Sequence, residues 1–352
     1  MSEPVHNPGS VASPAPAGLD LDRLSGWLAE HVPGFAGPLQ ATRFPGGQSN
    51  PTYQLTTPVR RYVLRRRPPG ELLKSAHAVD REFRVIRALH DAGYPTPEAY
   101  ALCEDTSVIG SIFYVMEMVD GRIMWDGRLA DHTPAERAGI YDAQIDVLAR
   151  LHSLDPALIG LADYGAAGNY FGRQVARWSK QYLASEAVEI PAMHRLMAWL
   201  PQGLPPEQKP RVVHGDFRLD NMVFHATEPR VLAVLDWELS TLGDPIADLT
   251  YFLMHWVTPP GERNSLNGLD LTAMGIPSME QVLARYAAIT GNHVESLDWC
   301  LAYNLFRVAA IVQGVAARHA AGIISTENAA RSQSRVAPLA EVAWSFAQRA
   351  GA

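Results

Sequence analysis

Two patterns of apolar and polar positions divide the chain. Near its start, Leu21, Leu24, Trp27 and Leu28 share one face of a predicted helix. Beyond it, short apolar and β-branched stretches bounded by Gly and Pro predict five strands, and a helix is expected over about residues 79–90. The predicted strands are residues 39–44, 52–56, 61–65, 99–103 and 112–118.

The pattern becomes helical after residue 122. Thr133-Pro134-Ala135-Glu136 has the form of a capping box with proline at the first helical position, and it predicts a helix that runs to His152. Residues 279–350 are helical and apolar, with scattered arginines. The chain therefore reads as α+β, with strands first and helices afterwards.

Composition is that of a globular intracellular protein. The chain has 352 residues, 47% of them hydrophobic and 19% charged, which is enough for about two domains or lobes with a real core. A net charge of −7 gives no support for nucleic-acid binding. Cys103 and Cys300 lie far apart without a ligand pattern, so neither a disulfide framework nor a zinc site is indicated. No apolar run approaches the roughly 18 residues of a membrane span, and no secretory signal is visible, so we expect a cytoplasmic protein.

Two segments carry the chemistry. The first is Val213-His214-Gly215-Asp216-Phe217-Arg218-Leu219-Asp220-Asn221, and the second is Leu235-Asp236-Trp237-Glu238. Asp216 stands where a carboxylate can accept the proton of a substrate hydroxyl, and His214 is expected to brace that loop. Asn221 and Asp236 offer oxygen ligands of the kind that Mg²⁺ uses beside nucleotide phosphates. Phosphoryl transfer needs this positioning of nucleophile, phosphate and metal.

These segments resemble the aminoglycoside phosphotransferase/choline kinase family of the protein kinase-like superfamily, in which His-Gly-Asp replaces His-Arg-Asp. The segments 217–221, 235–245 and 107–117 are similar to the branch whose eukaryotic relatives are fused to acyl-CoA dehydrogenases, and the similarity spans about residues 38–345. The resemblance implies a two-lobed protein kinase-like fold, with a five-stranded antiparallel sheet in the first lobe. The expected lobes are residues 19–118 and 122–352, joined by a hinge at 119–121, and the proline-rich residues 1–18 are expected to form a disordered tail.

The resemblance also implies a nucleotide site in the first lobe. Arg65 takes the place of the phosphate-binding lysine, and Glu82 would orient it unless it is an ordinary surface glutamate. Backbone groups at Glu117 and Met118 would meet the base. The glycine-rich loop is either a phosphate loop or an ordinary turn, and it comprises Gly46, Gly47, Gln48, Ser49 and Asn50.

Other candidate residues would bind the acceptor or support the loop that carries Asp216. Arg173, Arg177 and Lys180 recur on one helical face, which is either solvated or a site for an anion such as a carboxylate or a CoA phosphate. Glu238 could approach the metal or a substrate hydroxyl, or it could cap the turn. The remaining supports are His152, which could also be a core histidine, Asp244 as a helix N-cap, and Asp248 as a brace behind the loop.

The leading hypothesis is an ATP- and Mg²⁺-dependent phosphotransferase acting on a hydroxyl group of a small molecule. A hydroxy acid or a hydroxyacyl-CoA is a reasonable acceptor besides an aminoglycoside. The alternative is a pseudokinase that binds nucleotide or metabolite, for which Arg65 is the sequence argument. A serine hydrolase finds little support, because Ser49 lacks a nucleophile elbow. Oligomeric state and the choice between ATP and GTP stay open, and no membrane or nucleic-acid partner is expected.

Overall fold

The computed structural model describes residues 19–44, 50–68, 78–166, 168–262, 264–323 and 327–352. Contacts group the chain into two compact units. The sheet unit comprises Met1–Met124, Ala157–Leu161 and Asp220–Ser240, and the helical unit comprises Trp125–Pro156, Ala162–Leu219 and Thr241–Ala352. Each unit is described by itself below. The lobe limits expected from the sequence stay a prediction, and the expected tail lies outside the described residues.

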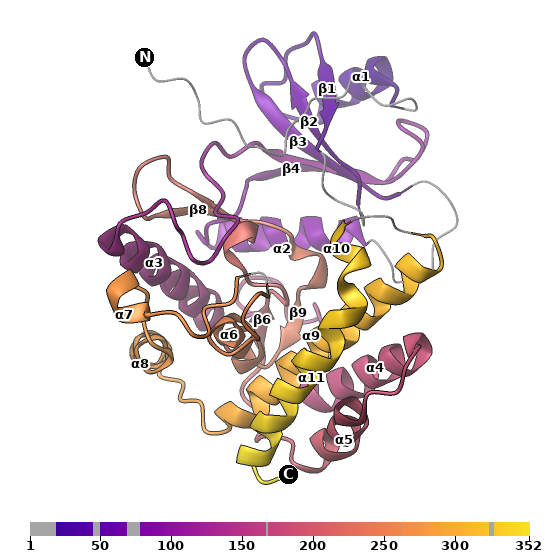
Figure 1. The fold of residues 1–352 in the computed structure, drawn as a ribbon. Coiled ribbons are helices and arrows are strands. Elements are labelled where there is room, and N and C mark those ends of the chain that lie inside the picture. The colour runs from indigo at the N-terminus through magenta and orange to yellow at the C-terminus, as the bar shows by residue number, and fades with distance from the viewer. Residues whose placement is uncertain (1–18, 45–49, 69–77, 167, 263, 324–326) are drawn as a thin grey trace. The chain divides into compact units, whose positions relative to one another are not determined.

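A five-stranded antiparallel sheet forms the centre of the sheet unit, as predicted, with strand order β1-β2-β3-β5-β4 (Figure 1). Its strands are β1 (Gln40–Arg43), β2 (Thr52–Thr56), β3 (Arg61–Arg66), β4 (Ala99–Cys103) and β5 (Phe113–Glu117). Helix α1 (Leu21–His31) is capped by Asp20, whose side chain accepts a hydrogen bond from the Arg23 N–H. Leu24 and Leu28 of α1 are fully buried in the same apolar cluster as Leu55 and Leu64 of the sheet.

The sheet unit also contains a helix and a second hairpin. Helix α2 (Val79–Asp91) follows β3, and the hairpin pairs β7 (Met222–Phe224) with β8 (Val231–Val234) in antiparallel register. The Val234 N–H donates to the Pro95 carbonyl at 2.8 Å, and Arg122 forms a β-bridge with Phe224. These backbone bonds tie residues 220–240 to the unit that carries the first strands.

Helices dominate the other unit. Thr133 and Glu136 form the predicted capping box at the start of α3, with both of its hydrogen bonds present. The short strands β6 (Arg211–Val213) and β9 (Thr241–Gly243) pair antiparallel. The helices are α3 (Pro134–Ser153), α4 (Tyr170–Ser185), α5 (Pro191–Trp199), α6 (Pro245–Leu253), α7 (Leu271–Met274), α8 (Met279–Thr290), α9 (Leu297–Ala320), α10 (Glu327–Ala330) and α11 (Ser332–Arg349).

Helix α9 is the core helix of this unit and departs from one expectation. By length and composition it could cross a membrane, although no such apolar stretch was predicted from the sequence. In its most apolar window of 18 residues, however, 78% of the residues are buried inside the protein. It packs against α4, α6 and α11, so its apolar character is that of a helix covered by other helices.

Candidate active site

The loop that carries Asp216 is held through its backbone. It leaves β6 at His214 and turns at Gly215, whose φ of 84° is readily adopted only by glycine. The carboxylate of Asp248, in the first turn of α6, accepts hydrogen bonds from the N–H groups of His214 and Gly215, the latter at 2.9 Å. The N-cap of α6 is Asp244, whose side chain accepts from the Ile246 N–H at 2.9 Å. The contacts predicted for Asp248 and Asp244 are therefore present.

His152 lies behind the same carboxylate. Its Nδ1 is 2.8 Å from the Tyr286 hydroxyl, its Nε2 is 3.6 Å from Asp248 Oδ2, and the residue is only 1% exposed. Burial works against the charge of Asp248, but His152, His214 and the Gly215 N–H together hold the pKa of Asp248 below its usual range. Both interpretations of His152 thus apply, since it is a buried histidine that also supports the carboxylate bracing the loop.

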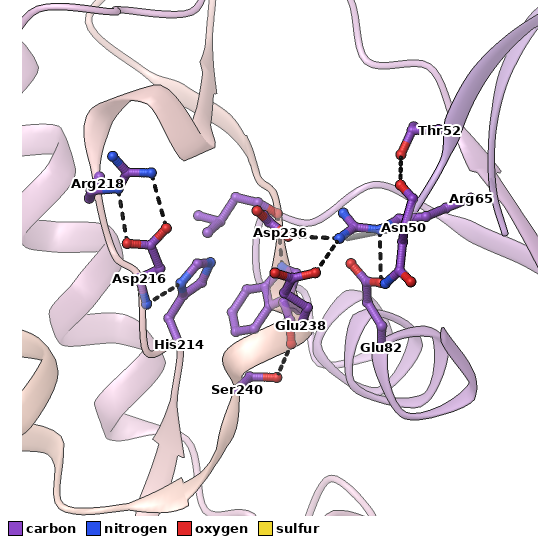
Figure 2. Close-up of polar contacts among 12 residues, drawn as sticks. Asn50, Thr52, Arg65, Glu82, His214, Asp216, Arg218, Asp236, Glu238 and Ser240 are labelled. Carbon is purple, nitrogen blue, oxygen red and sulfur yellow. Dashed lines mark hydrogen bonds and ion pairs between the residues drawn. The ribbon is translucent and has the colours of Figure 1, made fainter. Parts of the chain in front are cut away.

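Asp216 accepts hydrogen bonds from two side chains that the sequence did not single out. The Tyr251 hydroxyl donates to Oδ1 at 2.6 Å, and Arg218 lies at 2.9 Å from Oδ1 through Nε and at 3.1 Å from Oδ2 through Nη2. Figure 2 shows Arg218 against this carboxylate and the Asp216 N–H donating to His214 Nδ1, at 3.2 Å. Burial opposes ionisation, yet Arg218, Tyr251 and His214 lower the pKa of Asp216, so it is a carboxylate at neutral pH.

Arg307 of α9 contacts the loop from another element. Its guanidinium donates to the Gly215 carbonyl and stacks over the rings of Tyr251, at 5.1 Å, and Trp178, at 5.5 Å. The arginine is 5% exposed, and no carboxylate of the described part of the chain lies within ion-pair distance of it. Local sequence did not indicate this contact, because the partners of Arg307 lie on α4, α6 and the loop.

A second cluster lies in the sheet unit around Arg65. Its guanidinium is 3.1 Å from Glu82, 2.9 Å from Asp236 and 3.0 Å from Glu238, as Figure 2 shows. The distance to Arg65 shows the expected ion pair, and Glu82 is 2% exposed, so it is not a surface glutamate. Burial raises the pKa of Glu82 to about 7; Arg65 opposes the rise, and Asp236 and Glu238 add to it.

The two proposed metal ligands stand at one end of the β7–β8 hairpin. Asn221 directly precedes β7 and Asp236 follows β8, and the Leu235 N–H donates to the Asn221 carbonyl at 2.8 Å. Asp236 has a φ of 64°, a left-handed conformation that is uncommon for aspartate and is available to a short polar side chain. Three carboxylates around one guanidinium leave negative charge in this cluster.

That charge and those oxygen atoms fit a magnesium ion. Within the described residues, no group of three or more His, Cys, Asp or Glu side chains is spaced to hold a metal. Mg²⁺ is commonly bound through one or two protein oxygens, with phosphates and waters completing its shell. An amide oxygen and a carboxylate therefore satisfy what this ion requires of a protein.

The other predicted nucleotide contacts are only partly described. Gly46, Gly47, Gln48 and Ser49 lie outside the described residues. Asn50 is 1% exposed, and its carbonyl accepts a hydrogen bond from the Thr52 hydroxyl at 3.0 Å. The Glu117 N–H donates to the Glu98 carbonyl at 2.8 Å, so this group is engaged within the sheet unit, and Met118 is half-buried just after β5.

The basic residues of α4 have different surroundings. Arg177 and Lys180 are exposed, with the Arg177 guanidinium 5.0 Å from the Trp178 ring, whereas Arg173 is half-buried and donates to the Ala166 carbonyl at 2.9 Å. The cavity beside Arg173 has a volume of about 70 Å³, far below the roughly 300 Å³ at which small-molecule sites begin. These contacts do not decide between a solvated face and an anion site.

Sequence comparison extends the observations to known proteins. The model of the "Phosphotransferase enzyme family" matches residues 40–288. The chain is 44% identical to mouse acyl-CoA dehydrogenase family member 10 over 331 residues, and 42% identical to human acyl-CoA dehydrogenase family member 11 over 338 residues. These matches cover 93% and 94% of the chain but 31% and 43% of the relatives, so the chain spans less than half the length of either.

Structural comparison gives the same result. A crystal structure from Ralstonia eutropha, provisionally assigned as an aminoglycoside phosphotransferase, is 47% identical, with a TM-score of 0.87 and coverage of 94% of this chain and 98% of that one. Spectinomycin phosphotransferase, solved with ADP and spectinomycin, is 14% identical, with a TM-score of 0.60 over 93% of this chain and 98% of that chain. The first likeness is one of sequence and fold, and the second shows the fold alone. The fold is therefore kinase-like, as predicted.

Proposed function

Because this chain belongs to the phosphotransferase enzyme family, we propose that it transfers the terminal phosphoryl group of ATP to a hydroxyl group of a small molecule, with Mg²⁺. The observation that carries the proposal is the state of Asp216. It is an ionised carboxylate, held by neighbouring side chains on a loop whose backbone is anchored, five residues before Asn221.

Each residue has a role in this proposal. Asp216 orients the acceptor hydroxyl and takes its proton as the new P–O bond forms. Because its pKa is low, Asp216 is a weak base. The proton is therefore transferred late in P–O bond formation, and Asp216 acts mainly by orienting the hydroxyl. Asn221 and Asp236 would hold Mg²⁺, which would neutralise charge on the phosphate oxygens. Arg65 contributes a permanent positive charge for the phosphates and is oriented by Glu82.

The relatives and α4 support one class of acceptor in this proposal. Two curated relatives bear the name acyl-CoA dehydrogenase family member, which favours an acceptor of acyl metabolism such as a hydroxy acid or a hydroxyacyl-CoA. Arg173, Arg177 and Lys180 of α4 would attract such anions. They would repel a polycationic aminoglycoside, whose binding requires acidic side chains.

The test is a phosphotransfer screen with magnesium and ATP against aminoglycosides, amino alcohols, hydroxy acids and hydroxyacyl-CoAs. Asp216→Asn is the control, because it keeps the shape of the side chain and removes its charge. We expect one class of acceptor to be phosphorylated by the native protein and none by Asp216→Asn. Turnover retained by Asp216→Asn would refute the role of Asp216.

A pseudokinase is the second candidate, and one contact favours it. The guanidinium of Arg65 is already bound to Asp236 and Glu238, so a nucleotide would have to compete for it. This candidate predicts ATP binding, measured by calorimetry, without turnover across the whole panel.

A further inference from the structure

Helix α6 holds the Asp216 loop at two points. Asp248 and Tyr251 are three residues apart and therefore lie on the same side of the helix. Asp248 accepts the backbone N–H groups of His214 and Gly215, and Tyr251 donates its hydroxyl to the Asp216 side chain at 2.6 Å. One helix thus fixes both the backbone before Asp216 and the carboxylate itself.

The ring of Tyr251 is buried and contacts Arg307 of α9. Tyr251 is 7% exposed, and the Arg307 guanidinium lies 5.1 Å from the centre of its ring. Arg307 also donates to the Gly215 carbonyl, so one cation supports both the ring and the loop. Burial, together with the charge of Asp216, raises the pKa of Tyr251 well above its ordinary value, which keeps the hydroxyl protonated and donating.

The second donor to Asp216 is of another kind. Arg218 belongs to the loop itself, and its side chain is 25% exposed. A guanidinium binds both carboxylate and phosphate oxygens, so Arg218 can exchange Asp216 for a phosphate. Tyr251 comes from a different element, is neutral, and is enclosed by α6 and α9, so it is the donor suited to fix the direction of the carboxylate.

We propose that Tyr251 is a positioning residue, whose hydroxyl holds Oδ1 of Asp216 so that Oδ2 is directed to the acceptor hydroxyl. This inference rests on the proposed function, since it takes Asp216 as the group that meets the acceptor. It adds a residue outside the family's short motifs. The hydrogen bond also has a chemical effect, because a donor to a carboxylate stabilises its charged form.

The pH dependence follows from the groups that face Asp216. They are Arg218 and His214 from its own loop, Tyr251 from α6 and Arg307 from α9. Removing the Tyr251 hydroxyl takes away one interaction that lowers the pKa of Asp216 and leaves the three others. The pKa of Asp216 then rises. In a plot of kcat against pH, the fall of kcat on the acid side, called the acid limb below, therefore moves to higher pH by about one unit.

The experiment compares Tyr251→Phe with a matched control. Tyr141→Phe also removes a buried tyrosine hydroxyl in the helical unit, one that donates to the Gly127 carbonyl at 2.7 Å. The rate is measured with the acceptor from the screen, or as water-directed hydrolysis of magnesium-ATP. For Tyr251→Phe we expect kcat to fall at least about tenfold and the KM for ATP to stay within about twofold, because only orientation is lost. Tyr141→Phe should keep the native kcat and acid limb.

Three results separate the possible failures. If Asp216→Asn is inactive while Tyr251→Phe has the native kcat and acid limb, the positioning role is wrong and the proposed function stands. If Asp216→Asn is as active as the native protein, the proposed function itself has failed. If Tyr251→Phe does not fold, 3,5-difluorotyrosine at position 251 tests the positioning role instead, since it keeps the ring and its hydroxyl is a stronger hydrogen-bond donor. Its acid limb must move to lower pH, and an unmoved limb overturns the proposal.

Discussion

Substituting Arg65 by methionine tests the charge balance of the sheet unit most directly. The change keeps an apolar stem and removes the cation from a cluster of three carboxylates. One partner, Glu82, has a side chain only 1% exposed and lies 3.1 Å from the guanidinium. The other two, Asp236 and Glu238, are 37% and 29% exposed, so water screens their pairs with Arg65.

The size of the effect depends on pH through Glu82. Its pKa rises from 4.5 to about 7 in the folded protein. Protonated Glu82 therefore stabilises the fold fully below about pH 4.5, and this contribution, about 3 kcal/mol at most, is lost as pH rises through 7. Without Arg65 the pKa of Glu82 rises further. At pH 8 Glu82 of the variant is therefore protonated, and Arg65→Met should cost about 1.4 kcal/mol more than at pH 5.5, because pH 8 lies one unit above the native pKa of about 7. At pH 5.5 the neutral Glu82 needs no partner, and we expect about 1 kcal/mol from the exposed pairs.

Urea unfolding followed by circular dichroism at pH 5.5 and pH 8 measures both costs. Adding Glu82→Gln to Arg65→Met should recover most of the loss at pH 8, since no side chain at position 82 then has to take up a proton on folding. Arg285→Met is the matched control, because its pairs with Asp142 and Asp146 are 39–46% exposed, and it should cost under about 1 kcal/mol at either pH. Equal costs of Arg65→Met at the two pH values, or no recovery in the double variant, would refute the reasoning.

Three further substitutions test other parts of the structure. Asp248→Asn should cost about 3 kcal/mol at pH 7, measured by thermal unfolding, because it removes the charge that two backbone N–H groups and His152 stabilise. The cost should begin to shrink as pH falls below about 4, where the carboxylate protonates in the unfolded chain, and should shrink further until pH falls through the lowered native pKa of Asp248. Thr133→Ala should cost about 1 kcal/mol through the lost capping box, and Thr133→Ser should restore it. Gly121→Ala should cost at least about 2 kcal/mol, since a Cβ there would meet the Phe224 carbonyl oxygen at 2.2 Å, and an unchanged melting temperature would contradict that geometry.

Local patterns predicted the elements that depend on local interactions. The strands 52–56 and 99–103 begin and end as expected, and Thr133 with Glu136 forms its capping box. The pair of Arg65 and Glu82 could also be predicted, because the helix that follows the third strand brings Glu82 to it. In each case the deciding contacts join neighbouring residues or consecutive elements.

The supports of Asp216 could not be predicted in the same way. Tyr251 lies 35 residues beyond Asp216, and Arg307 contacts a carbonyl 92 residues away. Both belong to helices rich in apolar residues. From the sequence alone, a single polar side chain in such a helix would be assigned to the exposed face or to the edge of the core. The grouping of residues 220–240 with the sheet unit could not be predicted either. It depends on backbone hydrogen bonds to Pro95 and Arg122, and no sequence pattern marks these bonds.

Arginine at position 65 has a practical consequence for finding this protein in a mixture. In a survey with nucleotide reagents that acylate amines, a lysine beside the phosphates would react, whereas a guanidinium, which stays protonated, would not. The chain has three lysines, of which Lys180 and Lys209 lie outside the five-stranded sheet and Lys74 lies outside the described residues. A negative result in such a survey would therefore report the chemistry of one side chain and not the protein's affinity for nucleotide.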